Sequence, residues 1–215
     1  AEGGLLAAGG VEVGRYTVQN DDLDARGPFG WLRGGFGRLR GALATPWNPL
    51  HRRRLRRLVA REQPDVVHAH NTFPRLSPAV LESARGTGAA VVLTVHNFRM
   101  LCANGLFLRG GRPCTRCRDE QSVWPALRYG CYRGSRLATA PLAAMIALHR
   151  RRGTLARSVD AFICLTPFQR AQFVAAGWPP ERLFVKPNFR EAPAAPLARA
   201  ERDNRAVYLG RFSPE

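Results

Sequence analysis

The chain has 215 residues, of which 45% are hydrophobic and 23% are charged, a composition typical of folded globular proteins. The apolar residues recur in blocks, which excludes a disordered chain, and the length allows one large domain or two small ones. The longest apolar stretch, residues 137–148, is shorter than the roughly 20 residues of a membrane span and contains Pro141, so no membrane span is predicted.

The charge is strongly positive, because 33 lysines and arginines outnumber 16 acidic residues and give a net charge of +17. Such a charge favours anionic partners: nucleic acids, phosphorylated substrates or anionic lipids. Only Lys186 among the basic residues is a lysine, a bias that GC-rich genomes also produce. Since no zinc-finger, RNA-recognition or helix–turn–helix signature is present, a nucleic-acid partner is not predicted.

Five segments have the pattern of β-strands. They are residues 11–18, 66–70, 89–95, 161–166 and 183–186. The first alternates between apolar and polar residues, whereas residues 89–95 and 161–166 are almost continuously apolar. Continuous apolar strands are typical of a parallel sheet that is covered on both faces.

Four amphipathic or capped segments predict helices, at residues 50–61, 77–85, 137–152 and 166–177. The second and fourth begin with a serine or threonine cap followed by proline, and glycine follows or ends them. Alternation of strands and helices predicts right-handed βαβ units and therefore an α/β, doubly wound, Rossmann-like parallel sheet.

Polar residues follow the strands at the edge where doubly wound sheets bind their ligands. These residues are His68, His70, Asn71, Thr94, His96, Asn97, Thr166, Lys186 and Asn188. Packing alone does not explain so many polar side chains at several strand ends, so this edge is the predicted ligand site.

The order and spacing of five motifs make the resemblance to a known family specific. The motifs are Pro64–Asn71 (PDVVHAHN), Val92–Asn97 (VLTVHN), Phe162–Thr166 (FICLT), Val185–Asn188 (VKPN) and Val207–Glu215 (VYLGRFSPE). Together they resemble family 4 of the retaining glycosyltransferases, which have the GT-B architecture of two Rossmann-like domains that face each other across a cleft.

The resemblance implies a division of the chain. Residues 1–189 would be the N-terminal, acceptor-side domain without its first strand, residues 190–205 the interdomain linker, and residues 206–215 the start of the donor-binding domain. The glycine-rich loop, lysine and paired glutamates that this family uses for the donor are not in the sequence. The chain by itself is therefore expected to be inactive.

The resemblance also implies the site residues. His96 would be catalytic, near the transferred sugar and the acceptor, and His70 and Asn71 would line the acceptor side. The other implied substrate-binding residues are Asn97, Thr166, Asn188 and Arg211. The guanidinium of Arg211 would bind the donor diphosphate, an anion that arginine contacts in bidentate fashion. Catalysis would need no cofactor, because cationic side chains replace a metal ion.

Four cysteines lie in the long connection of residues 97–136. Cys102, Cys114, Cys117 and Cys131 have the spacing C-x11-C-x2-C-x13-C, a pattern compatible with a structural zinc site of four thiolates. The alternative is free thiols or a redox-labile pair. Cys164 lies in a predicted strand and is expected to be a small apolar core residue.

Arginines cluster in residues 51–58 (HRRRLRRL). This run is either a solvated helix face or a basic amphipathic helix that contacts anionic lipid. His51 in this run and His149, beside three arginines, are predicted to be surface residues. The predicted location is cytoplasmic, with peripheral association at the inner face of the cell membrane.

The sequence thus predicts a bacterial-type retaining glycosyltransferase that moves a sugar from a nucleotide-sugar donor to a glycan or lipid-linked acceptor. Cell-surface polysaccharide or glycolipid synthesis is the predicted pathway class. Two alternatives stay open, namely a nucleotide-sugar epimerase of GT-B form and a non-catalytic module that binds sugar nucleotides or polyanions.

Overall fold

The computed structural model describes residues 6–18, 41–73 and 76–189. Contacts divide the chain into two units, residues 15–187 and residues 1–14 together with 188–215. The fold below is that of the first unit. The predicted linker (190–205), the predicted start of a second domain (206–215) and Arg211 lie outside the described residues.

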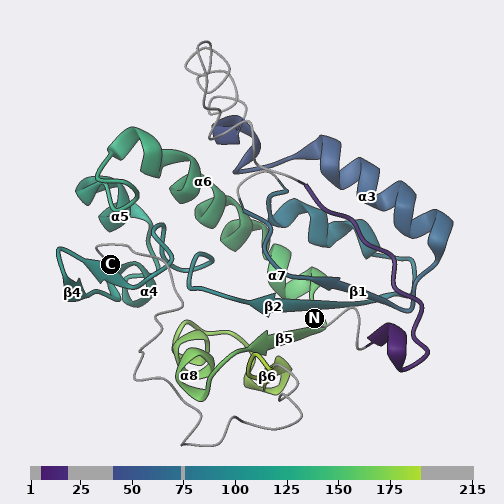
Figure 1. The fold of residues 1–215 in the computed structure, drawn as a ribbon. Helices are drawn as coiled ribbons and strands as arrows, with labels where there is room; N and C mark the ends of the chain where they lie inside the picture. Colours follow the sequence, from purple (N-terminus) through teal and green to yellow (C-terminus); the bar gives the residue numbers. More distant parts are fainter. Residues whose placement is uncertain (1–5, 19–40, 74–75, 190–215) are drawn as a thin grey trace, which may run out of the picture. The chain divides into compact units, whose positions relative to one another are not determined.

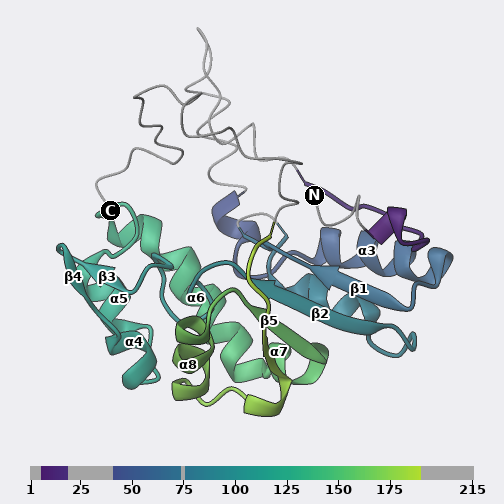
Figure 2. The ribbon, with the colours of Figure 1, turned by 60° about the horizontal axis from the view of Figure 1, so that its bottom comes forward.

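A four-stranded parallel sheet forms the centre of this unit (Figures 1 and 2). Its strands are β1 (Val66–Ala69), β2 (Ala90–Val95), β5 (Ala161–Cys164) and β6 (Leu183–Val185), in the order β1-β2-β5-β6. The predicted α/β class and four of the five predicted strands are confirmed. Because each new strand is added on the same side of the previous one, right-handed crossovers bring the connecting helices to one face of the sheet.

The predicted strand at residues 11–18 is wrong. These residues have no regular secondary structure, and Val11 and Val13 are 50% and 37% exposed. An alternating pattern forms a strand only where the backbone also finds a neighbouring strand to pair with, and the described sheets do not include this segment.

The four predicted helices are present, one of them in a different form. They are α3 (Pro49–Glu62), η2 (Pro78–Ala84), α6 (Arg136–Arg152) and α8 (Pro167–Ala175). The second is a 3₁₀-helix rather than an α-helix. The predicted caps are confirmed, since Ser77 Oγ accepts from the backbone N–H of Ala79 at 3.1 Å and Thr166 Oγ1 accepts from that of Gln169 at 3.0 Å.

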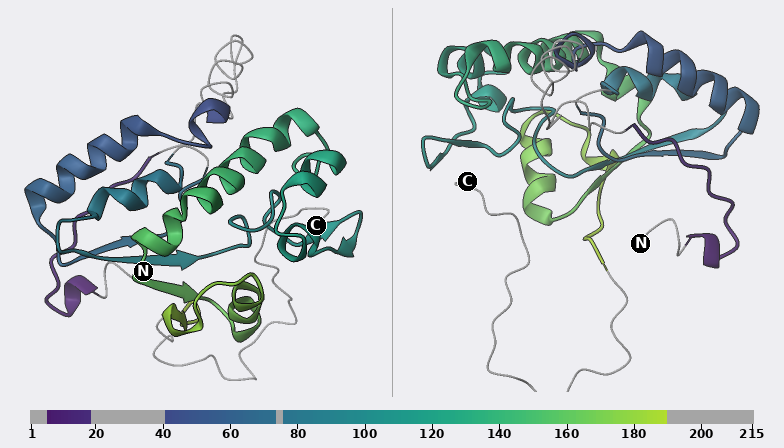
Figure 3. Two further views of the ribbon diagram at one scale, coloured as in Figure 1. Left: turned by 180° about the vertical axis from the view of Figure 1, so that it is seen from behind. Right: turned by 45° about the horizontal axis from the view of Figure 1, so that its top comes forward.

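The main hydrophobic core lies between one face of the sheet and these helices. It joins alternate strand residues such as Leu93 and Phe162 to Val59 of α3, Leu81 of η2 and Phe173 of α8. Figure 3 shows α3 and α6 on the same side of β1 and β2. The opposite face is half-buried within the described residues, so the expected cover on both faces is seen there for one face only.

The segment between β2 and α6 contains short elements that the sequence did not predict. They are the hairpin of β3 (Leu108–Arg109) and β4 (Arg112–Pro113), and the helices α4 (Arg116–Asp119) and α5 (Trp124–Tyr129). A second, smaller core packs α4 and α5 against α6 through Cys117, Ala126 and Met145. Two further short helices are α7 (Thr154–Ser158) and η3 (Pro180–Arg182).

Two histidines that were predicted at the surface are not fully exposed. His149 is only 3% exposed, because its Nε2 donates to the Pro46 carbonyl at 2.9 Å and its ring stacks on Trp47. Burial lowers the pKa of His149. His51 is half-buried and lies 2.6 Å from the hydroxyl of Tyr16. The surface prediction is therefore wrong for His149, and His51 is at the surface only in part, whereas Cys164 is fully buried in β5, as predicted.

Candidate functional site

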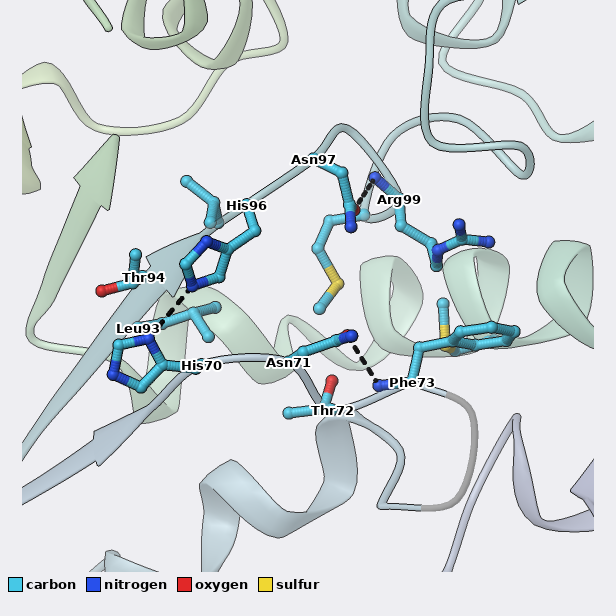
Figure 4. A pocket seen from close by; sticks show the side chains of 12 residues that line it. His70, Asn71, Thr72, Phe73, Leu93, Thr94, His96, Asn97 and Arg99 are labelled. Carbon is cyan, nitrogen blue, oxygen red and sulfur yellow. Dashed lines mark hydrogen bonds between the residues drawn. The ribbon is translucent and has the colours of Figure 1, made fainter. Parts of the chain in front are cut away.

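A pocket lies beyond the carboxyl ends of β1 and β2 (Figure 4). His70 follows the last residue of β1, and His96 follows the last residue of β2. Because the two strands are parallel neighbours, both imidazoles come to the same edge, and His70 Nδ1 lies 3.0 Å from His96 Nε2. The pocket has a volume of about 30 Å³, and its lining includes His70, Asn71, Thr72, Phe73, Thr94, His96, Asn97, Arg99 and Met145.

A second histidine contact supports this pair from within the sheet. Residues two apart on a strand point to the same face, so His68 lies beneath His70, with ring centroids 4.3 Å apart. His68 Nε2 is 2.8 Å from the buried hydroxyl of Thr94, which is two residues before His96. The Thr94 contact therefore holds the row of three imidazoles at the sheet edge.

The contact between His70 and His96 has a chemical consequence. In a hydrogen bond between two neutral imidazoles, one nitrogen donates and the other must accept. Both rings are exposed, so a bound hydroxyl group can reach them from solvent. Such a pair can hold a proton at one end and accept a hydrogen bond from a sugar hydroxyl at the other.

The two asparagines of the pocket shape the loops that carry them. Asn71 Oδ1 accepts from the backbone N–H of Phe73 at 3.2 Å, and Asn97 Oδ1 accepts from that of Arg99 at 2.9 Å. These are turns in which the side-chain oxygen replaces a backbone acceptor. Since each oxygen is used in this way, the amide NH2 groups are the donors that these side chains offer to a sugar (Figure 4).

Arg99 adds a positive charge to the pocket and was not among the predicted site residues. Its guanidinium lies over the ring of Phe73, 4.4 Å from the centroid, and donates to the carbonyl of Ala103 at 3.2 Å. Gly105 permits this position, because its φ is +80° and a Cβ there would lie 3.2 Å from Arg99 Nη2. In the sequence, the only sign that Arg99 belongs to the pocket is that it lies two residues beyond Asn97.

Comparison with known families decides the identity of the chain. Residues 4–188 match the family described as glycosyl transferase 4-like domain. The chain belongs to this family. No curated protein and no solved structure matches the chain. Membership of this family makes the chain a glycosyltransferase domain, with a sugar donor and an acceptor as the substrates of the reaction.

Four of the residues implied to bind substrate lie together in the glycosyl transferase 4-like domain, as does Thr94 of the predicted edge. His70, Asn71, His96 and Asn97 line one pocket. Thr166 is at the same edge of the sheet, at the end of β5, but it caps α8 and does not line this pocket. Asn188 belongs to the other unit of the chain, and Arg211 lies outside the described residues. The roles assigned to these residues stay predictions.

The four predicted metal-binding cysteines of the glycosyl transferase 4-like domain also converge. All four line a second pocket, of about 10 Å³, and all are free thiols. Burial, and then the neighbouring thiol of Cys102, raise the pKa of Cys117 to about 11. In the described part of the chain, no three His, Cys, Asp or Glu side chains already form a group that could hold a metal ion.

None of the described helices of the domain combines the length and the apolar content that crossing a bilayer requires.

The arginines of α3 lie in two different environments. Arg52 lies against the buried Glu82, with 3.3 Å between Nε and Oε2, whereas Arg53, Arg54, Arg56 and Arg57 are exposed.

Proposed function

We propose that this domain binds the acceptor in a retaining glycosyltransferase whose donor is a nucleotide sugar. The observation that carries the proposal is the pair His70–His96 with the amides of Asn71 and Asn97 at one edge of a parallel sheet. Exposed imidazoles with neighbouring amides are hydrogen-bonding groups that suit sugar hydroxyls, and that edge is the ligand-binding edge of such sheets.

In the proposed reaction, the bond between the sugar C1 and the diphosphate oxygen breaks, and a bond forms between C1 and the acceptor oxygen on the same face. The proton of the acceptor hydroxyl passes to the departing diphosphate. His96 hydrogen-bonds to the reacting groups and holds them in position, while His70, its neighbour at 3.0 Å, fixes the ring of His96. Arg211 is proposed to offset the charge of the diphosphate, in place of a metal ion.

The test is an assay of the complete gene product with a panel of nucleotide sugars and of glycan or lipid-linked acceptors. We expect a product whose anomeric configuration, determined by NMR, equals that of the donor, without added divalent cations. An inverted product contradicts retention. Conversion of the nucleotide sugar without an acceptor indicates the epimerase, and binding without any product indicates the non-catalytic module.

The acceptor is proposed to be lipid-linked or part of a cell-surface glycan, and the domain to work at the inner face of the cell membrane. The support for this is the exposed arginine face of α3, whose other face packs on the core through Val59. A helix with arginines outward and its apolar side held by the fold presents fixed positive charge, which attracts anionic lipid headgroups.

Vesicle binding tests this surface. The double variant Arg53→Gln/Arg57→Gln removes two exposed charges of α3, each worth about 1 kcal/mol near an anionic membrane, so the partition coefficient should fall about 30-fold. The matched control, Arg85→Gln/Arg157→Gln, removes two exposed arginines elsewhere. Co-sedimentation with phosphatidylglycerol vesicles at low salt measures both. Equal loss in the two variants, or no binding by the wild type, contradicts the proposed membrane face.

A further inference from the structure

The four cysteines come from four separate pieces of the segment between β2 and α6. Cys102 lies in the loop after β2, Cys114 follows β4, Cys117 lies in α4 and Cys131 follows α5. All four line one pocket of about 10 Å³, close to the volume that one small bound species occupies. The fifth cysteine, Cys164, belongs to β5 and does not line it.

The elements around this pocket are too short to be stable by themselves. The two strands have two residues each, and the helices α4 and α5 have four and six residues. Helices of this length do not repay the cost of nucleation, and a two-stranded hairpin is marginal in water. The second core, to which α4 and α5 contribute, consists of only six buried residues. A cross-link among the four pieces would supply the stability that this small core lacks.

Two arginines and one backbone N–H group interact with the thiols. Arg109 lines the pocket and interacts with Cys131, and the charge of Arg150 interacts with Cys117. Arg150 Nη2 is buried and has no hydrogen-bond partner among the described residues. The backbone N–H of Ala126 donates to the sulfur of Cys117. These groups suit an anionic centre better than a cluster of neutral thiols.

From this arrangement we infer that Cys102, Cys114, Cys117 and Cys131 bind one structural Zn²⁺. Four thiols lose their protons on binding, and the tetrathiolate centre carries a charge of −2, which Arg109 and Arg150 offset. The side chains must turn toward the pocket for this, since they do not yet form a metal-binding group and Cys102 Sγ donates to Asn104 Oδ1 at 3.0 Å. No ligand position stays open, so the ion acts on stability and not on the sugar transfer itself.

The proposed centre is joined to the loop that follows His96. The backbone N–H of Cys102 donates to the carbonyl of Phe98 at 2.8 Å, and the N–H of Phe98 donates to that of Gly105 at 2.9 Å. Loss of the ion would therefore loosen the residues next to Asn97. The inference does not depend on the proposed retaining mechanism, since its measurements use metal content and stability.

The first experiment measures zinc and thiols in the purified 215-residue chain. We expect one zinc per chain by mass spectrometry of the metal, and five reactive thiols after unfolding with a chelator. Replacement of the zinc with Co²⁺ should give the intense charge-transfer absorption of cobalt–thiolate bonds. Chain without zinc that takes up neither Zn²⁺ nor Co²⁺ overturns the inference, and fewer than five thiols indicates a disulfide in its place.

The second experiment compares two alanine variants. Cys117→Ala should lose the zinc, whereas Cys164→Ala, which removes a fully buried thiol outside the pocket, should keep it. A chelator should lower the Tm of the wild type and of Cys164→Ala by roughly 10 °C. Full zinc content in Cys117→Ala overturns the assignment of this ligand. If Cys117→Ala does not fold, the metal content of the wild type still decides.

Discussion

Replacement of His96 with alanine should lower the rate of sugar transfer by the complete gene product at least about 100-fold, with little effect on binding of the donor. His96 is exposed at the end of β2 and paired with His70 at 3.0 Å. A displacement of reacting groups by about 1 Å can cost on the order of 10²-fold in rate, and His96 is proposed to hold these groups in position. Truncation of the side chain removes that contribution and leaves the fold intact, because an exposed ring adds little to the core.

Steady-state kinetics and a separate measurement of donor affinity check this result. The expected pattern is a lower kcat with an almost unchanged dissociation constant for the donor. His51→Ala is the matched control, since this histidine of α3 does not line the pocket and its loss should leave transfer unchanged. Transfer at the wild-type rate by His96→Ala would refute the catalytic role of His96.

Replacement of Phe173 with alanine should strongly lower stability, by about 3–5 kcal/mol in the free energy of unfolding. Phe173 is fully buried in α8, and its ring centroid lies 4.5 Å from that of Trp178 and 6.0 Å from that of Phe98. Alanine leaves a cavity between α8 and the sheet that these rings cannot refill. Phe98 immediately follows Asn97, so the same cavity loosens the pocket loop.

Phe168→Ala on the same helix is the control, because that ring is 65% exposed. Its loss should cost less than about 1 kcal/mol, since it removes little buried area. Urea unfolding and thermal unfolding measure both variants, and the Tm of Phe173→Ala should fall by about 10 °C. Similar values for the two variants would mean that α8 does not contribute to the core as its burial indicates.

The sheet and its helices could be predicted because their signals are local. Residues 89–95 and 161–166 are almost continuously apolar, and they became the two central strands. Thr166 and the proline after it started a helix, as a cap and a preset φ angle dictate. Residues 11–18 carried an equally regular pattern and formed no strand, because strand formation depends on a neighbour that the local pattern does not contain.

In the pocket, too, some features follow from local sequence signals and others depend on contacts between distant segments. His70, Asn71, His96 and Asn97 could be predicted to share an edge, because parallel strands end at one side of a sheet. The support of that edge by the contact of His68 with Thr94 involves residues 26 positions apart and follows from the pairing of β1 with β2. The position of Arg99 over Phe73 likewise depends on how two loops meet.

Residue types and their spacing in the sequence by themselves determined the α/β class, four strands, the helix caps and the chemistry available at the carboxyl edge. Only the tertiary structure decided that His149 is buried against Pro46 and Trp47, and that four cysteines from four short pieces line one pocket. The reason is physical. Backbone propensity and apolar pattern act within about ten residues, whereas burial and convergence depend on the surfaces that distant segments present to one another.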